Sequence, residues 1–250
     1  MGRGSRVVAG VTALAAVLAC AAPALARDRV IAVDGVAKHR SDLRVEILVQ
    51  VPAGTSARAA ALRALEAQNA KPAAPVSSAF TLNGLRWDNL PVVQHYNPAG
   101  QPTGLAAQTA LSATYGDWSG VANSNYRIQG GTNTSRCPSL VRECRGAQTY
   151  DGFNDVGWSR LSGSTLGVTW YSTSIDEADM AINTRYSWNT GSNCPQVAGR
   201  YNLETVYLHE NGHVAGLGHS TNTSAVMYPS YQTARCALAQ DDINGIASLY

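Results

Sequence analysis

The sequence predicts an α+β domain that follows an export signal and a small leader segment. Two observations predict this class. Strand-like runs alternate with helix-like segments over residues 79–250, and the spacing of apolar residues changes accordingly. In addition, 45% of the 250 residues are apolar and only 14% are charged. A chain of this length and composition can bury the core of one domain.

The first 26 residues have the pattern of a secretory signal. Arg3 and Arg6 form a basic start, residues 7–18 are apolar but too short to span a bilayer, and residues 24–26 form an A-x-A cleavage site. We therefore expect a secreted, extracellular protein without a transmembrane span. Residues 18–20 also resemble a bacterial lipidation site, which leaves anchoring through Cys20 as the alternative.

Residues 27–78, which we call the leader, are interpreted as a pro-segment and linker. A strand is expected over residues 45–51 and a helix over residues 56–70, capped by its first residue, Ser56. The run of lysine, alanine and proline at residues 71–75 is typical of a linker. The leader is too small to hold much of a core by itself.

Charge divides unevenly between the leader and the rest of the chain. Residues 27–75 contain eight basic and five acidic side chains, and residues 76–250 contain nine basic and twelve acidic ones. Opposite signs would help the leader to dock on the domain. The sequence contains no basic patch of the kind that would indicate a nucleic-acid partner.

The first half of the domain provides three predicted strands and a helix. Strands are expected at residues 90–96, 126–128 and 156–161. Residues 104–118 carry apolar side chains at steps of three and four, which favours a helix packed on a sheet. The turn at residues 151–155 has carboxylates that suit Ca²⁺, although an ordinary polar turn explains them equally well.

The most informative stretch is His209–His219, which has the pattern H-E-x-x-H-x-x-G-x-x-H. On a helix, His209 and His213 lie on one face about 6 Å apart along the axis. Gly216 allows the chain to leave the helix, so that His219 can become the third ligand of a catalytic zinc. Glu210 can then act as general base towards a water molecule.

This helix is expected over residues 201–216, with Asn202 as its N-cap. Gly212 lies in its interior and costs about 1 kcal/mol relative to alanine. The local preference for a helix is therefore weak, as often happens at functional sites.

Four cysteines remain after the signal, an even number that suggests two disulfides in an exported chain. Three connectivities are possible. We expect Cys137–Cys144 to staple one loop and Cys194–Cys236 to tie together the two sides of the histidine site. None of them has the C-x-x-C spacing of a zinc site.

Together these motifs resemble the matrixin branch of the metzincin metalloproteases. The long histidine motif is followed by Ser220, by a Met-turn around Met227 at residues 224–231, and by a last segment, residues 240–250, similar to the matrixin C-terminal helix. The resemblance implies the metzincin fold: a twisted mixed β-sheet with a packing helix, a zinc-binding helix and a C-terminal helix. Met227 is then the residue that packs under the metal ligands.

The resemblance also implies where a substrate binds. Residues 164–171 are similar to the edge strand of the family, whose free backbone groups pair with an extended peptide. Strand residues Leu166, Gly167 and Val168 are then expected to hold the substrate. Pro229 and Tyr231 are expected to wall the pocket for the residue after the cleaved bond.

This chain also departs from the matrixin pattern. It has no histidine between His95 and His209, so we expect no second, structural zinc, and His95 itself is interpreted as a strand residue. The family holds its pro-form inactive through a cysteine, and the leader has none. An acidic residue such as Asp28 or Asp34, steric covering, or no latency at all are the alternatives.

The sequence therefore predicts a secreted, monomeric zinc endopeptidase that cleaves an extended peptide or protein, with one catalytic Zn²⁺. The rival hypothesis is a non-cleaving, zinc-bearing extracellular binding protein. The presence of Glu210 argues against the rival, because a binding protein has no need of this base.

Overall fold

The structure is a computed structural model that describes residues 28–73, 80–144, 150–174, 176–191 and 193–250. The predicted signal, Cys20 and the predicted boundary between residues 78 and 79 lie outside these ranges. In the part of the chain that is described, no helix has the length and apolarity needed to cross a membrane.

One sheet organises the described residues, and its strands have the order β3-β1-β2-β7-β8-β6-β4-β5. The half made of β8, β6, β4 and β5 is parallel, whereas β3, β1, β2 and β7 pair antiparallel. The strands are β1 (Arg29–Ala37), β2 (Arg40–Val51), β3 (Ala70–Pro72), β4 (Val92–Tyr96), β5 (Ile128–Gly130), β6 (Asn154–Ser159), β7 (Thr165–Ser172) and β8 (Ala178–Asn183). The predicted mixed sheet is confirmed.

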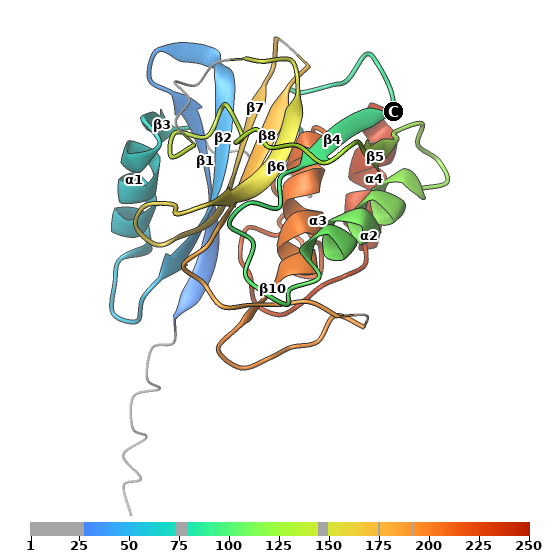
Figure 1. Ribbon diagram of the computed structural model, residues 1–250. Coiled ribbons are helices and arrows are strands. Elements are labelled where there is room, and N and C mark those ends of the chain that lie inside the picture. The colour runs from blue at the N-terminus through green and yellow to red at the C-terminus, as the bar shows by residue number, and fades with distance from the viewer. Residues whose placement is uncertain (1–27, 74–79, 145–149, 175, 192) are drawn as a thin grey trace, which may run out of the picture.

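Helices cover both faces of this sheet (Figure 1). On one face lies α1 (Ala57–Ala67), and on the other lie α2 (Ala107–Ser119), α3 (Leu203–Val214) and α4 (Gln240–Leu249). A short parallel pair, β9 (Trp188–Asn189) and β10 (Tyr201–Asn202), precedes α3. The predicted packing helix, histidine-bearing helix and C-terminal helix are all present, so the α+β class is confirmed.

Each face of the sheet has its own core, and the leader contributes to both. On the α3 face, Leu48 of β2 joins the larger core of the domain. On the α1 face, leader residues such as Ile47 and Leu65 pack with Leu161 and Trp170 of the domain. The leader, which is too small to bury a core of its own, thus shares a core with the domain.

This arrangement corrects two sequence predictions. Residues 164–171 were expected to form an edge strand, but β7 lies between β8 and leader strand β2. The backbone donors and acceptors that an edge strand would leave free are paired with those of β2. Residues 71–75 were expected to be linker, but residues 70–72 form β3 and pair with β1. Pro72 is tolerated there because β3 is the outermost strand.

Other boundaries differ by a few residues. The strand expected at residues 126–128 is β5, which begins at Ile128. In α1 the predicted cap is confirmed, since Ser56 Oγ accepts a hydrogen bond from Ala59 N. The helix ends at Ala67, three residues early, because Asn69 adopts a positive φ of 54° and turns the chain into β3.

Candidate active site and metal centre

Helix α3 is held deep in the larger core. It spans residues 203–214 instead of the predicted 201–216, and its predicted cap is confirmed, because Asn202 Oδ1 accepts a hydrogen bond from Thr205 N at 2.9 Å. Trp118 of α2 donates from its indole nitrogen to the carbonyl of Leu208 at 3.0 Å. Burial on all sides fixes the direction of the side chains that α3 presents to the sheet.

The chain turns sharply after α3 at Gly216, whose φ is 101°. A Cβ atom at this position would collide with the backbone carbonyl of Leu85. Leu217 N donates back to the carbonyl of Gly212 at 2.9 Å, which closes the helix end. The turn carries His219 back towards α3, so its ring centroid lies 4.9 Å from that of His213.

The three histidines are oriented by hydrogen bonds to their Nδ1 atoms. His209 pairs with the carbonyl of Val226 at 2.7 Å, and His213 with the carbonyl of Leu217 at 2.8 Å. His219 pairs with the Oδ2 atom of a leader carboxylate, Asp34, at 2.8 Å. In each ring the Nε2 atom is left to face the same point.

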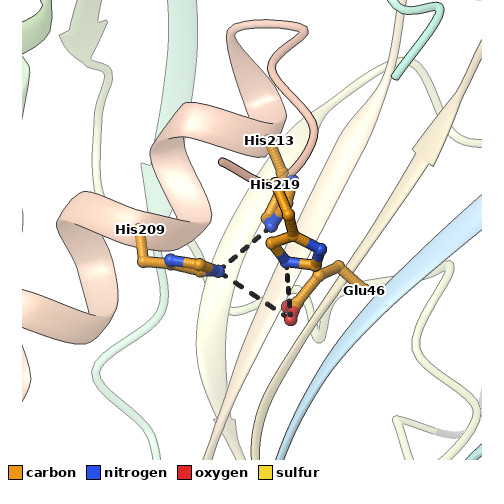
Figure 2. Close-up of side chains that lie close together, drawn as sticks. All are labelled: Glu46, His209, His213 and His219. Carbon is orange, nitrogen blue, oxygen red and sulfur yellow. Dashed lines mark hydrogen bonds and ion pairs between the residues drawn. The ribbon is translucent and has the colours of Figure 1, made fainter. Parts of the chain in front are cut away.

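A fourth side chain, Glu46 of leader strand β2, points into the histidine group (Figure 2). Its Oε1 atom lies 3.9 Å from His209 Nε2 and 3.8 Å from His219 Nε2, and its side chain is fully buried. One ligand atom from each of these four residues lies within 4.8 Å of the others. Among the described residues, this is the one group of histidine, cysteine and carboxylate side chains that could hold a metal.

Asp28 and Asp34, which were one of three alternatives for latency, do not belong to this group. Asp28 bonds Gln50 and Ala53, and Asp34 contacts the outer nitrogen of His219. Glu46 was missed. The available signal was a single charge inside the apolar run of residues 45–49, since a buried charge is normally paired or bound to a metal.

The arrangement fits a zinc ion. Zinc takes four ligands at about 2.0–2.2 Å in a tetrahedron, which separates neighbouring ligand atoms by about 3.4 Å. The Nε2 atoms of His209 and His213 are 3.2 Å apart. His219 Nε2 and both Glu46 oxygens are buried without a hydrogen-bond partner at normal distance. A cation at their centre would satisfy them.

The protonation of two of the imidazole rings also suits metal binding. Burial lowers the pKa of His209 to about 3 and the pKa of His213 well below its usual value, and the neighbouring His219 lowers both further. Both imidazoles are therefore neutral near pH 7, the form that binds a metal.

Glu210 lies beside this group and is fully buried. Its Oε2 atom accepts a hydrogen bond from Thr169 Oγ1 of β7, while Oε1 has no hydrogen-bond partner. Burial raises the pKa of Glu210 well above its usual value, and the neighbouring carboxylate of Glu46 raises it further. A glutamate with a raised pKa can exchange a proton near neutral pH.

The Met-turn is held from α4. The carboxylate of Asp242 accepts hydrogen bonds from Val226 N at 2.9 Å and from Met227 N at 3.1 Å. Met227 is 1% exposed and packs against Gly212 of α3, on the helix that carries His209 and His213. Asp242 was not singled out from the sequence, because its partners lie about fifteen residues away.

The predicted substrate-binding residues lie together beside the histidines but are covered by the leader. Gly167 and Val168 pair with Leu48 and Ile47 of β2 in the sheet register. On the other side, Ala32 N of β1 donates to the carbonyl of Pro229 at 3.1 Å. Leu166, fully buried, and Tyr231, partly buried, complete the predicted set.

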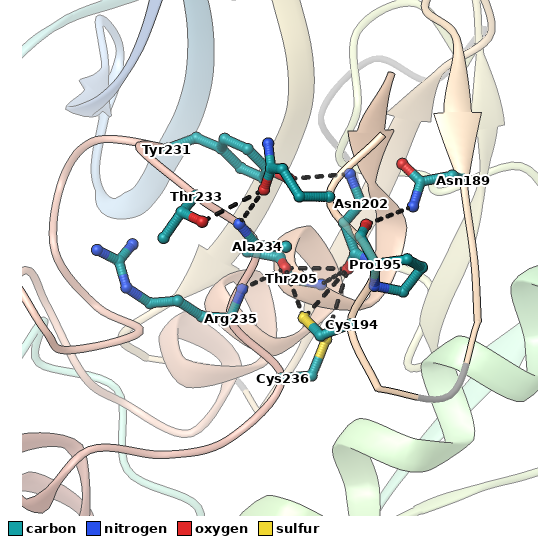
Figure 3. Close-up of a disulfide and its surroundings, with 11 residues drawn as sticks. Asn189, Cys194, Pro195, Asn202, Thr205, Tyr231, Thr233, Ala234, Arg235 and Cys236 are labelled. Carbon is teal, nitrogen blue, oxygen red and sulfur yellow. Dashed lines mark hydrogen bonds between the residues drawn. A yellow bond between two sulfur atoms is a disulfide. The ribbon is translucent and has the colours of Figure 1, made fainter. Parts of the chain in front are cut away.

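Both expected disulfides are present. Cys137–Cys144 closes a loop with a sequence separation of 7, and Cys194–Cys236 bridges a separation of 42. Figure 3 shows the second bridge next to Asn202, the cap of α3. It joins the segment before α3 to the segment after the Met-turn, as predicted.

The turn at residues 151–155 was considered for Ca²⁺. Both oxygens of Asp155 accept hydrogen bonds from Arg136 at 2.8 Å, and Asp151 Oδ1 caps the turn by accepting from Phe153 N. Calcium therefore stays a prediction without further support. His95 lies in β4, where its Nδ1 atom pairs with the carbonyl of Thr132.

A mixed sheet over a buried helix, with a three-histidine group closed by a glycine turn and a Met-turn below, is the arrangement of the metzincin fold. Comparison with known proteins agrees. Residues 153–250 match the family model described as Matrixin. This match supports the resemblance to matrixins that the motifs predicted, over the part of the chain that carries them.

Individual relatives match over shorter stretches. The chain is 52% identical over 56 residues to Metalloendoproteinase 1 of Glycine max, covering 22% of this chain and 18% of that protein. It is 54% identical over 57 residues to Stromelysin-1 of Equus caballus, covering 21% and 12%. It is 41% identical over 76 residues to Neutrophil collagenase of Homo sapiens, covering 29% and 15%. The match thus spans less than a fifth of each relative.

Proposed function

We propose that this chain is an exported, zinc-dependent endopeptidase, made with a signal at residues 1–26, a leader at residues 27–78 and a catalytic domain at residues 79–250. The observation that carries the proposal is the convergence of three imidazoles, each oriented by a hydrogen bond to its Nδ1 atom, beside Glu210. His209, His213 and His219 would hold the metal, and Met227 would support them from below.

Zinc, when bound, polarises the carbonyl of the scissile peptide bond and lowers the pKa of a water molecule towards about 7. Glu210 would accept a proton from that water as it attacks. The same carboxyl would then donate the proton to the leaving amine. Thr169 donates a hydrogen bond to one Glu210 oxygen and leaves the other directed to the site.

The substrate would be an extended peptide. Backbone groups of Leu166, Gly167 and Val168 on β7 would pair with it once the leader has left. Tyr231 would form a wall of the neighbouring pocket, and the carbonyl of Pro229, which now accepts from Ala32 N, would pair with the substrate backbone. The relatives named collagenase and stromelysin do not identify the substrate of this chain, because their match covers only a small part of each.

The test is cleavage of a mixed, quenched-fluorescent peptide library by the exported protein, with zinc measured on every sample. Glu210→Ala should keep zinc and lose cleavage. Glu204→Ala, on the same helix but only partly buried in its first turn, is the matched control and should cleave normally. Zinc-loaded wild-type protein that cleaves nothing after loss of the leader would instead favour the non-cleaving binding protein.

A further inference from the structure

The leader occupies both walls of the predicted peptide cleft. Strand β2 runs antiparallel to β7, with Glu46 opposite Thr169 and Leu48 opposite Gly167. Strand β1 reaches the Met-turn segment, where Ser230 Oγ donates to the carbonyl of Val30 at 2.7 Å. The leader thus makes the backbone contacts that an extended peptide would make.

Its side chains fill the site as well. Residues 46 and 48 are two apart on a strand, so both face α3. Glu46 reaches the histidines, and Leu48 forms one wall of a pocket whose other walls include Val206, His209 and Tyr231. With Leu48 in place, the space left in this pocket is only about 20 Å³, close to the volume that one water molecule needs.

We propose that the leader keeps the enzyme latent by making Glu46 the fourth ligand of the metal. This inference rests on the proposed function and adds its regulation. A catalytic zinc keeps one position open for water, whereas a site closed by four protein ligands does not. Glu46, His209, His213 and His219 form such a closed set.

The charge of Glu46 requires a partner. Its carboxylate is fully buried, and neither oxygen has a hydrogen-bond partner at normal distance. Its neighbour Glu210 is also a carboxyl group, so it can share a proton with Glu46 but supplies no positive charge. Burying an unpaired carboxylate is strongly unfavourable, and ligation to a dication removes this cost. Glu46 therefore adds to the leader's affinity for the domain only when the metal is present.

The rest of the leader is held by contacts on the opposite face of the sheet. Trp170 donates from its indole nitrogen to Gln68 Oε1 at 3.1 Å, and Arg142 donates to the carbonyl of Ala67 at 2.6 Å. Together with the joint core, these contacts would hold the leader on the domain even after the chain between them has been cut. A single cut after residue 73 leaves the leader seated, so activation requires its removal or further cleavage.

The decisive probe is access of a small ligand to the metal in the uncut chain. Co²⁺ replaces zinc in the wild type, in Glu46→Gln and in Glu66→Gln. The last is the matched control, a leader glutamate at the surface that pairs with Lys38. The visible spectrum of Co²⁺ is followed as acetohydroxamate, a small bidentate metal ligand, is added.

We expect Glu46→Gln to bind acetohydroxamate at least about ten-fold more tightly than the wild type, the size of effect that changes around a metal typically cause. Glu66→Gln should behave as the wild type. Equal binding by all three proteins would overturn the proposal.

Failure of the proposed function gives a different result. A specific protease site placed within residues 74–79 allows the same proteins to be cut after folding. If the cut proteins cleave the peptide library once the leader is displaced, but acetohydroxamate binds equally before the cut, latency by Glu46 is wrong and the endopeptidase stands. If Glu46→Gln alone opens the metal but no leader-free protein cleaves peptides, the closed site stands and the endopeptidase is wrong.

Discussion

Met227 packs against the backbone of Gly212: its Sδ and Cε atoms occupy the space that a Cβ atom at residue 212 would need. Trp118 Cζ2 would lie 2.9 Å from the same Cβ. The glycine that weakens the helix in sequence terms is therefore the residue that lets the Met-turn approach α3 beneath the histidines. Tertiary packing has overridden local propensity at this position.

Gly212→Ala should consequently destabilise the protein, although alanine is the better helix former by about 1 kcal/mol. Overpacking of a tight core typically costs about 1–3 kcal/mol, which outweighs this gain. Gly116→Ala on α2 is the control, because a Cβ there meets nothing within 4 Å, and it should stabilise. Urea unfolding of both variants checks the opposite signs. Two stabilised variants would contradict the packing argument.

Asp34 should strengthen metal binding through His219. Its Oδ2 atom lies 2.8 Å from His219 Nδ1 and orients the ring, although the carboxylate itself is outside the metal group. Asp34→Asn should weaken zinc affinity about 10- to 100-fold, as for other outer partners of metal-binding histidines. Competition with a chromogenic chelator measures this. Asp28→Asn, which changes a leader carboxylate bonded to Gln50, should leave the affinity unchanged.

The two disulfides should contribute unequally to stability. A cross-link lowers the entropy of the unfolded chain more when it closes a longer loop. For separations of 42 and 7 residues, this predicts losses of about 4 kcal/mol and about 2.5 kcal/mol when each pair is changed to serine. Denaturant unfolding of Cys194→Ser/Cys236→Ser and Cys137→Ser/Cys144→Ser compares them. The reverse order would show that local packing outweighs loop length.

Asp179 should make stability depend on pH. Burial raises its pKa from 3.8 to about 7, although its carboxylate accepts hydrogen bonds from Leu140 N and Asp155 N. The folded state then binds the proton more tightly than the unfolded state. The contribution of Asp179 to the free energy of unfolding is therefore complete below pH 3.8 and is lost as pH rises to about 7.

In Asp179→Asn this decline should be smaller than in the wild type. The free energy of unfolding, measured by urea at intervals from pH 4 to pH 8, checks the slope. Asp88→Asn changes a carboxylate whose side chain is 84% exposed, and it should keep the wild-type slope. An unchanged slope in Asp179→Asn would exclude a raised pKa for this group.

Much of the fold could be predicted because local patterns carried it. The cap at Asn202, the turn at Gly216 and the apolar spacing of α2 depend on residues close together in the sequence. The pairing of Cys194 with Cys236 was expected among three possible connectivities, and the structure contains it. In each case few alternative structures satisfied the same pattern.

The sequence by itself determined the class of protein, since the spacing of His209, Glu210, His213 and His219 is set by the geometry of one helix and one turn. Only the tertiary structure decided that Glu46, 163 positions before His209, faces those histidines. The pairing of β2 with β7 depends on which extended segment satisfies an open strand, and no local preference specifies that choice.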